Sequence, residues 1–331
     1  MRTKICAALA ILMLCAGAGR AQEPDTLMLA TGGRAFFNYL PVTLAEKIGA
    51  FSEQNLKVVI NDFQGGPKSI EALVGGSVDM VVATYENTVL LQTKGIQLTA
   101  ITLINHSLGA AIAIQKKYAK TRKNPADMKG LTFGVTSAGS ALQRILLTYV
   151  GKGGLKINDV AIIGIGGGSS AVAALQSRKV DGFAHVDPVL TEAMKTGDWE
   201  ILVDTRTDEG MKLIFGGDIA ATAVVTTPDY IKRKPVAAQK FVNAMVRTLK
   251  WMNTAPVDEV LAMVPPEFYS DKESYRRALI AQTKIYSQDG IFKPEVIDRT
   301  YKSMVEEGLV SASQKVSLSD TFTNEFSEKV K

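Results

Sequence analysis

Aliphatic runs and helical patterns alternate along the first two thirds of the chain. Residues 27–33 (LMLATGG) and 131–139 (LTFGVTSAG) each predict a buried strand that ends in threonine and small residues. Residues 78–87 (VDMVVATYEN) and 180–188 (VDGFAHVDP) predict two more strands with their exit loops. The residues between them place aliphatic side chains on one helical face. Strands that alternate with helices predict a parallel sheet with helices on both faces, which is an α/β fold.

An internal repeat relates the two halves of this pattern. Residues 63–79 (FQGGPKSIEALVGGSVD) and 165–181 (IGGGSSAVAALQSRKVD) share six identities in seventeen positions at a constant offset of 102. Each copy predicts a strand, a glycine turn, a short helix and a further strand, and the upstream strands extend each half to a βαβαβ unit. Two such halves predict two α/β lobes, an arrangement that binding proteins and some enzymes share.

The rest of the chain sets the borders of these lobes. Residues 213–235 contain an extended segment, closed by Pro228, that we expect to cross back to the first lobe. Amphipathic helices are predicted at 236–252, 271–286 and 294–308, and we expect them to pack on the first lobe. We therefore predict a first lobe of residues 22–108 and 218–331, a second lobe of residues 109–217, and crossings near 105–112 and 214–224.

The N-terminus predicts export. Arg2 and Lys4 precede a short apolar run and then small residues, which is the pattern of a secretory signal peptide over residues 1–21. The run is shorter than the roughly 20 apolar residues that a spanning helix needs. A lipid anchor at Cys15 is disfavoured because Leu14, rather than a small residue, precedes it. We expect a periplasmic protein.

Composition excludes several classes of function. Both cysteines, Cys6 and Cys15, lie in the predicted signal, so the mature chain would have no disulfide and no thiolate chemistry. The signal also contains three of the 38 basic residues and none of the 33 acidic ones, which leaves 35 against 33 and a net charge of about +2. Nucleic-acid binding is therefore not indicated. The remaining 310 residues suffice for two lobes.

Enzyme motifs are weak in this chain. Gly164 and Gly166 fit the start of a dinucleotide fingerprint, but Ser169 occupies the place of its third glycine. The chain has no phosphate-binding P-loop, no G-x-S-x-G motif and only two histidines, His106 and His185. No His, Asp and Glu residues have metal-ligand spacing. We expect no catalytic residue, no metal and no cofactor.

Four turns at predicted helix N-termini are candidates for ligand binding. They comprise residues 31–33, 65–69, 136–140 and 167–170. In a parallel α/β lobe, ligands bind at the carboxyl ends of the strands, where free N–H groups and the helix dipole attract anions. Glycine allows a close approach of the backbone, and serine and threonine add hydroxyl donors. A single turn of this kind fits an ordinary N-cap, but four at equivalent places favour one shared site.

Longer motifs carry a family resemblance. Residues 40–81 contain a helix that ends at 49–51 (GAF), a strand that begins at 55–58 (NLKV) and the glycine turn and helix of 65–79. GLTFGVTSAGSALQRIL and AALQSRKVDGFAHVDPVL follow. With these motifs the chain resembles the periplasmic substrate-binding proteins of ABC importers for nitrate, sulfonates, taurine and thiamine-pyrimidine precursors. The resemblance implies a two-lobed periplasmic-binding-protein fold of type II, with mostly parallel sheets flanked by helices and a ligand cleft between the lobes.

The same resemblance implies which residues bind the ligand. By analogy, the pocket consists of Thr31, Gly32, Gly33, Phe37, Tyr39, Gly65, Gly66, Lys68, Ser69, Thr84, Tyr85, Thr136, Ser137, Ser140, Gly168, Ser169, Ser170, His185 and Asp187. Arg34 joins this set because Arg34 and Lys68 are the cations that we expect to bind an anionic group.

Asp187 departs from the pattern of the taurine and sulfonate members, which often carry an aromatic residue before this proline. Its carboxylate would repel a pure anion. It could pair with a ligand amine, position Arg34 or Arg144, or belong to an Asx-Pro turn. Glu86 raises the same question.

The expected function is capture of a small organic anion, either sulfonate- or taurine-like or an aromatic carboxylate. A monomeric protein would close around it and deliver it to a permease with its ATPase in the inner membrane. Three alternatives stay open: a binder of an aminopyrimidine thiamine precursor or another aromatic ligand, a pyrimidine-synthase-type enzyme of the same fold, and a sensor that signals to a membrane kinase.

Overall fold

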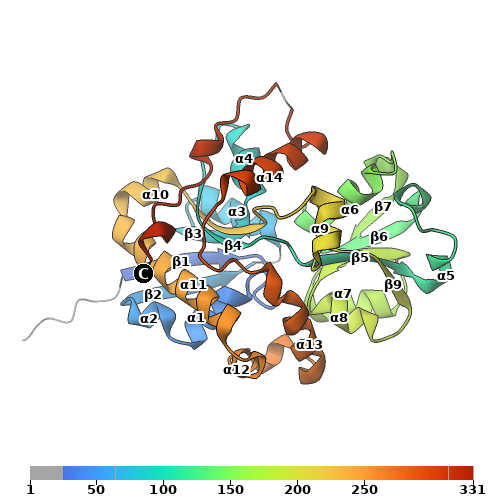
Figure 1. The fold of residues 1–331 in the computed structure, drawn as a ribbon, viewed down its shortest axis with the longest axis horizontal. Coiled ribbons are helices and arrows are strands. Elements are labelled where there is room, and N and C mark those ends of the chain that lie inside the picture. Colours follow the sequence, from blue (N-terminus) through green and yellow to red (C-terminus); the bar gives the residue numbers. More distant parts are fainter. Residues whose placement is uncertain (1–24, 64, 312, 331) are drawn as a thin grey trace, which may run out of the picture.

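The computed structural model describes residues 25–63, 65–311 and 313–330. The predicted signal peptide, with Cys6 and Cys15, lies outside the described residues. The described residues form two lobes that lie side by side, each built around one five-stranded sheet (Figure 1). No helix among them is long and apolar enough to cross a membrane.

The first lobe contains a sheet with the strand order β2-β1-β3-β10-β4. Its strands are β1 (Asp25–Thr31), β2 (Leu56–Asp62), β3 (Met80–Thr84), β4 (Thr99–Asn105) and β10 (Thr222–Thr226). β1 pairs in parallel with β2 and β3, whereas β10 pairs antiparallel with β3 and β4. Every residue of β4 and β10 is buried, which explains why these strands consist largely of aliphatic residues and threonine.

The second lobe repeats this arrangement. Its sheet has the order β7-β6-β8-β5-β9. The strands are β5 (Ala110–Gln115), β6 (Thr132–Val135), β7 (Ala161–Gly164), β8 (Gly182–Val186) and β9 (Trp199–Asp204). β6 pairs in parallel with β7 and β8, and β5 pairs antiparallel with β8 and β9. The βαβαβ units predicted from the repeat therefore occupy equivalent places in the two sheets.

Each sheet is mostly parallel, as the sequence predicted, with one strand of the five reversed. The reversed strands are β5 and β10, which directly follow the two passages of the chain between the sheets, at residues 106–109 and 216–221. The chain passes between the lobes at the cleft, so it enters the next sheet at the edge that faces the cleft. The neighbouring parallel strands end at this edge, and the entering strand therefore runs antiparallel to them.

Helices cover both faces of each sheet (Figure 1). In the first lobe they are α1 (Leu40–Lys47), α2 (Ala50–Glu53), α3 (Gly66–Val74) and α4 (Glu86–Gln92). In the second lobe they are α5 (Lys116–Ala119), α6 (Ala141–Gly151), α7 (Gly168–Gln176), α8 (Val189–Met194) and α9 (Asp208–Phe215). The C-terminal part adds α10 (Pro228–Arg233), α11 (Pro235–Thr254), α12 (Val257–Ala262), α13 (Lys272–Gln282) and α14 (Pro294–Glu306). Short 3₁₀ helices lie at Pro125–Met128, Ile157–Asp159, Pro266–Phe268, Thr283–Ile285, Leu318–Asp320 and Ser327–Lys329.

The long helix α11 completes the core of the first lobe. The predicted stripe of apolar residues on it is confirmed, since Phe241, Met245, Leu249 and their neighbours in the stripe are buried. They pack in one cluster with Leu27 and Leu29 of β1. Full burial of each such side chain stabilises a fold by roughly 1.5–3 kcal/mol.

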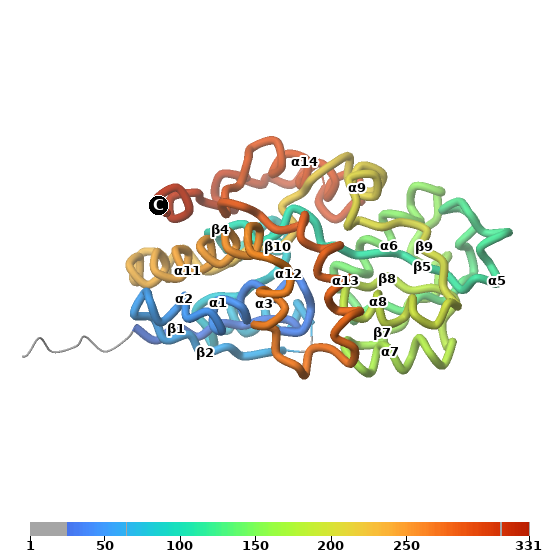
Figure 2. The backbone as a smooth tube through the Cα atoms, turned by 60° about the horizontal axis from the view of Figure 1, so that its bottom comes forward, coloured from blue at the N-terminus to red at the C-terminus, as the bar shows by residue number. Residues whose placement is uncertain are grey.

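The C-terminal helices also contact the second lobe, which the sequence did not predict. α13 packs on α8 (Figure 2), and α14 packs on α4 (Figure 1) and on α9. The lobes are thus joined by the two crossing segments and by helices on two sides.

Candidate functional site

A cavity of about 560 Å³ lies between the two lobes. This volume falls in the range of sites for small molecules. The first lobe lines it with Gly32, Gly33, Arg34, Ala35, Phe36, Asn38, Tyr39, Asp62, Phe63, Gly65, Gly66, Pro67, Lys68, Thr84, Glu86, Asn87, Leu90, Leu108 and Thr222. The second lobe lines it with Thr136, Ser137, Gly139, Ser140, Ala141, Leu142, Gly166, Gly167, Gly168, Ser170 and Val186.

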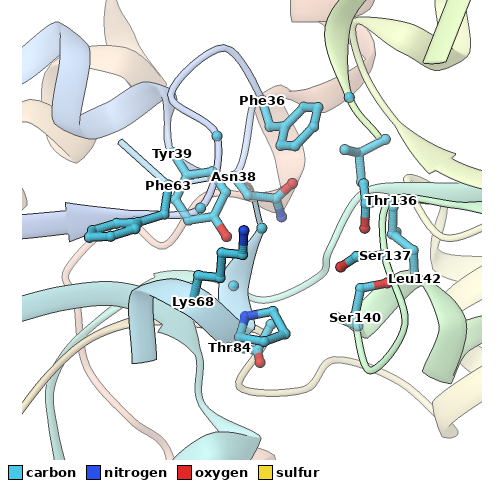
Figure 3. A pocket seen from close by; sticks show the side chains of 18 of the residues that line it. Phe36, Asn38, Tyr39, Phe63, Lys68, Thr84, Thr136, Ser137, Ser140 and Leu142 are labelled. Carbon is cyan, nitrogen blue, oxygen red and sulfur yellow. The ribbon is translucent and has the colours of Figure 1, made fainter. Parts of the chain in front are cut away.

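The four predicted turns meet at this cavity. They follow β1, β2, β6 and β7 at the carboxyl ends of these strands, and each turn contributes lining residues. Thirteen of the predicted site residues line the cavity: Gly32, Gly33, Arg34, Tyr39, Gly65, Gly66, Lys68, Thr84, Thr136, Ser137, Ser140, Gly168 and Ser170. Figure 3 shows Tyr39, Lys68 and Thr84 on one side and Thr136, Ser137 and Ser140 on the other.

Two of the glycines are required by close contacts. A Cβ on Gly32 would lie 2.8 Å from both the Gly66 amide nitrogen and the Tyr39 hydroxyl oxygen. A Cβ on Gly65, whose φ is +97°, would lie 3.3 Å from the Ser137 hydroxyl oxygen of the other lobe. The lobes therefore touch at this point, and backbone amide groups reach the cavity surface.

The charged residues around the cavity differ in their partners. Arg34 donates to Glu46 (Nη2 to Oε2, 2.7 Å), so its charge is already paired. Asp62 accepts at Oδ1 from the Thr31 hydroxyl at 2.8 Å and from the Gly33 and Arg34 amides at 2.9 and 3.0 Å. It therefore shapes the turn after β1.

Lys68 is the charged lining residue that has no partner within the described part of the chain. It lies in the first turn of α3, and its side chain is exposed. In Figure 3 the Lys68 side chain and the Tyr39 hydroxyl point toward the space between the lobes. Burial and the nearby Asp62 carboxylate raise the pKa of Tyr39, which keeps the hydroxyl protonated and able to donate.

Two further hydroxyls in the cavity wall have no partner among the described residues. The oxygens of Ser137, from the second lobe, and Thr222, from β10 of the first, are both buried. A buried polar atom without a hydrogen bond costs about 1–3 kcal/mol. A polar group of a ligand between the lobes could form the missing hydrogen bond with either hydroxyl.

Phe36 provides an apolar contact across the cleft. A Cβ on Gly167 would lie 2.3 Å from its ring, and the ring meets that of His185 edge to face at 5.7 Å. Phe36 comes from the loop after β1 yet packs against both hydrophobic clusters of the second lobe. With Phe63, Leu90 and Leu142 it gives the cavity an apolar part.

Five predicted site residues do not line the cavity. Four of them are held elsewhere by other contacts, and the fifth lies outside the lining. Thr31 is buried and bonds to Asp62, and the Ser69 hydroxyl donates to the Gly66 carbonyl at 2.8 Å. Phe37 is buried and stacks on a core tyrosine at 4.8 Å. The Tyr85 hydroxyl bonds to Thr321 at 2.5 Å. Ser169 is exposed at the start of α7, outside the lining.

His185 supports the cavity without lining it. Its side chain is completely buried, with Nε2 3.1 Å from the Gly166 carbonyl oxygen, while Nδ1 accepts from the Val186 amide at 3.0 Å. Burial lowers the pKa of His185, so the ring is neutral and donates through Nε2. It therefore fixes the carbonyl group of Gly166 in the turn before α7.

Asp187 does not line the cavity either. It is fully buried, and Oδ2 accepts from Arg206 Nη1 at 3.0 Å and from Gln282 Nε2 at 3.1 Å. Oδ1 accepts from the amide and the hydroxyl of Thr191 at 3.0 and 2.6 Å. The residue pairs with neither Arg34 nor Arg144, as had been considered. Its carboxylate binds Arg206 and joins the second lobe to α13.

Several lining residues were missed. Asn38, Leu108 and Thr222 carried no motif, and Phe63 stood only at the start of the repeat. Thr222 reaches the cavity only because β10 pairs with β3, opposite Thr84. Glu86 had been noted without being assigned to the site. Within the described residues, no group of three His, Cys, Asp or Glu side chains could hold a metal ion.

Two α/β lobes joined by two crossings, with a polar cavity between them, define the fold of the periplasmic binding proteins. The alkanesulfonate-binding protein SsuA from Xanthomonas axonopodis pv. citri, solved with MOPS, superposes with a TM-score of 0.72 at 18% identity, over 92% of this chain and 99% of that one. The periplasmic nitrate-binding protein NrtA from Synechocystis PCC 6803 gives a TM-score of 0.68 at 16% identity, over 93% and 86% of the two chains.

A structure from Bordetella bronchiseptica RB50 is more similar, with 34% identity and a TM-score of 0.86 over 93% of this chain and 97% of that chain. Residues 21–264 match the NMT1-like family. The chain therefore belongs to the NMT1-like family. No curated protein matches it in sequence.

Proposed function

We propose that this protein is the solute-binding component of an ABC importer and that it captures a small organic anion between its lobes. The fold has the required geometry, and relatives of this fold include proteins named for binding alkanesulfonate and nitrate. As in the sequence-based expectation, the protein would act as a periplasmic monomer that hands its ligand to a permease driven by an ATPase.

The observation that carries the proposal is how the charged side chains around the cavity are paired. Of the charged lining residues, Arg34 is paired with Glu46 and Glu86 is paired with Arg144. The Asp62 carboxylate accepts three hydrogen bonds. Among the described residues this leaves Lys68 as the charged lining side chain with neither an ion pair nor a hydrogen bond, so an anionic group of a ligand would complete the site.

Neutral donors support the same conclusion. The N-terminal turns of α3, α6 and α7 border the cavity, and a helix N-terminus favours an anion by about 0.3–1 kcal/mol when exposed and by more when buried. The unpartnered hydroxyls of Ser137 and Thr222 add one donor from each lobe. A ligand that bonds to both would favour the closed arrangement of the lobes.

We further propose that the protein binds its ligand without chemical turnover. No histidine or cysteine occurs among the lining residues, and the carboxylates there are engaged as described above. Within the described lining, no histidine is therefore available to activate the Ser137 or the Thr222 hydroxyl as a nucleophile.

The test is a calorimetric titration of the purified protein with ethanesulfonate, taurine, nitrate, benzoate and a neutral aminopyrimidine. We expect at least one anion to bind, and Lys68→Met to weaken it about 10- to 100-fold, as loss of a charge-assisted hydrogen bond implies. The control is Lys57→Met, because Lys57 is an exposed lysine of β2 outside the lining. Binding of the aminopyrimidine alone, or undiminished anion binding by Lys68→Met, would contradict the proposal.

A further inference from the structure

A buried cluster of ionised side chains joins the two lobes beside the cavity. Arg144 of α6 forms an ion pair with Glu86 of α4, the helix of the first lobe that begins at the cavity wall. The same guanidinium contacts Glu307, which directly follows α14 (Nε to Oε2, 2.6 Å), and donates to the Ser303 hydroxyl at 3.1 Å. One side chain of α6 thus binds two further helices, α4 and α14.

The cluster is shielded from solvent. The side chains of Arg144, Glu86 and Glu307 are only 9%, 11% and 11% exposed. The guanidinium carbon also lies 5.5 Å from the centre of the Phe215 ring, at the end of α9. In such surroundings a charge left without its partner is strongly disfavoured. Separation of α4 from α6 would break the ion pair between Arg144 and Glu86.

Both ends of the link lie close to cavity residues. On α6, Arg144 follows Ser140, Ala141 and Leu142, which line the cavity. On α4, Glu86 itself lines it and accepts a hydrogen bond from the Thr84 hydroxyl at 3.3 Å. The guanidinium of the second lobe therefore pairs with a carboxylate in the wall of the first lobe.

We infer that Arg144 is a positioning residue that holds the lobes closed and, in doing so, masks the Glu86 charge from a bound anion. The masking rests on the proposed function, whereas the link between the lobes does not. The closed arrangement would thus be the one that accepts an anion, since only there does Arg144 reach Glu86.

A second ion pair between the lobes provides a matched comparison. Lys195, after α8, pairs with Asp271, before α13 (Nζ to Oδ2, 3.0 Å), and the two side chains are 33% and 46% exposed. Exposed ion pairs contribute little because water and salt screen them. Lys195→Gln should leave the lobes where they are, although it also breaks a contact between them.

The experiment measures the distance between the lobes without any ligand. Residues 22–331 contain no cysteine, so Glu71→Cys on α3 and Gln176→Cys on α7, both exposed, give one pair of sites for single-molecule fluorescence transfer. We expect Arg144→Gln to raise the ratio of open to closed molecules at least tenfold, Arg144→Lys to restore part of the closed population, and Lys195→Gln to change nothing.

Unchanged distances in Arg144→Gln, or an equal change in Lys195→Gln, would overturn the inference. If Arg144→Gln does not fold, Glu86→Gln decides the matter, because it removes one partner and leaves the Glu307 contact. It should raise the open fraction by a smaller factor, and an unchanged fraction would refute the link. A titration with ethanesulfonate and benzoate then reports on the masking. If neither anion binds even the wild-type chain, the proposed function is weakened, while the distances still decide whether Arg144 holds the lobes.

Discussion

Replacement of Asp187 by asparagine tests whether this residue acts on structure or on the ligand. The buried Asp187 oxygen Oδ2 accepts from Arg206 and Gln282. An asparagine NH2 group in its place would face these two N–H donors and could accept from neither. Breaking a buried ion pair costs about 3–5 kcal/mol. Arg206 keeps two bonds to Asp204, at 2.9 and 2.7 Å, so we take the lower value of about 3 kcal/mol. For a chain of this size that lowers the melting temperature by about 5 °C.

The assay is thermal unfolding followed by circular dichroism, together with a ligand titration well below the melting temperature. The control is Asp198→Asn in the same lobe, where the Arg178–Asp198 pair is 58% and 34% exposed. We expect no measurable change in the control and nearly unchanged ligand affinity in Asp187→Asn. A variant that melts like the wild type but no longer binds would refute the placement of Asp187 in a structural role.

Three further predictions concern the cavity and its support. Gly32→Ala should weaken ligand binding at least tenfold in a calorimetric titration, because its Cβ would lie 2.8 Å from the Gly66 amide nitrogen; unchanged affinity would show that this turn does not shape the site. Ser137→Ala should leave the unfolding temperature unchanged or slightly raised and weaken binding about 3- to 10-fold, the loss of one hydrogen bond; equal affinity would place its hydroxyl away from the ligand. Burial lowers the pKa of His185, so the unfolded chain takes up a proton below about pH 6.5 while the native chain does not, and the free energy of unfolding should fall as the pH drops from 6.5 to 5. In denaturant titrations, His185→Gln should make the free energy of unfolding fall less between pH 6.5 and 5. Part of the decrease should persist because burial also lowers the pKa of His106. An unchanged pH dependence in His185→Gln would contradict the claim that His185 stays neutral in the native protein.

The four glycine turns were predictable because local and topological rules coincide there. Strand, glycine turn and helix follow one another directly in the sequence, and carboxyl ends of parallel strands meet at one edge of a sheet. The duplicated turns at 65–69 and 167–170 therefore had to face one cleft once two lobes were inferred. The structure brings residues of all four turns together around one cavity.

Neighbouring aromatic residues could not be assigned in the same way. Phe36 and Phe37 are adjacent, yet Phe36 crosses the cleft to Gly167 while Phe37 stacks in the core on Tyr275. Both lie in an irregular loop, where no strand or helix period fixes the direction of a side chain. Their different roles depend on contacts with residues more than a hundred positions away.

Charged residues were the least predictable part of the site. The roles of Asp187 and Arg34 follow from their partners, which are Arg206 and Gln282 for the first and Glu46 for the second. A sequence gives the charges but not the pairs. The same holds for Arg144, since its link to Glu307 requires α14 to lie against the second lobe, whereas amphipathic periodicity shows only that this helix has a buried face.

The central claim is that the two lobes enclose a small organic anion bound by Lys68. The most direct measurement is a native mass spectrum of the protein as purified from the cells that export it. We predict one bound organic acid per chain, retained by Lys57→Met and lost by Lys68→Met. A bound molecule that is neutral or cationic, or an anion that Lys68→Met retains in full, would contradict the claim.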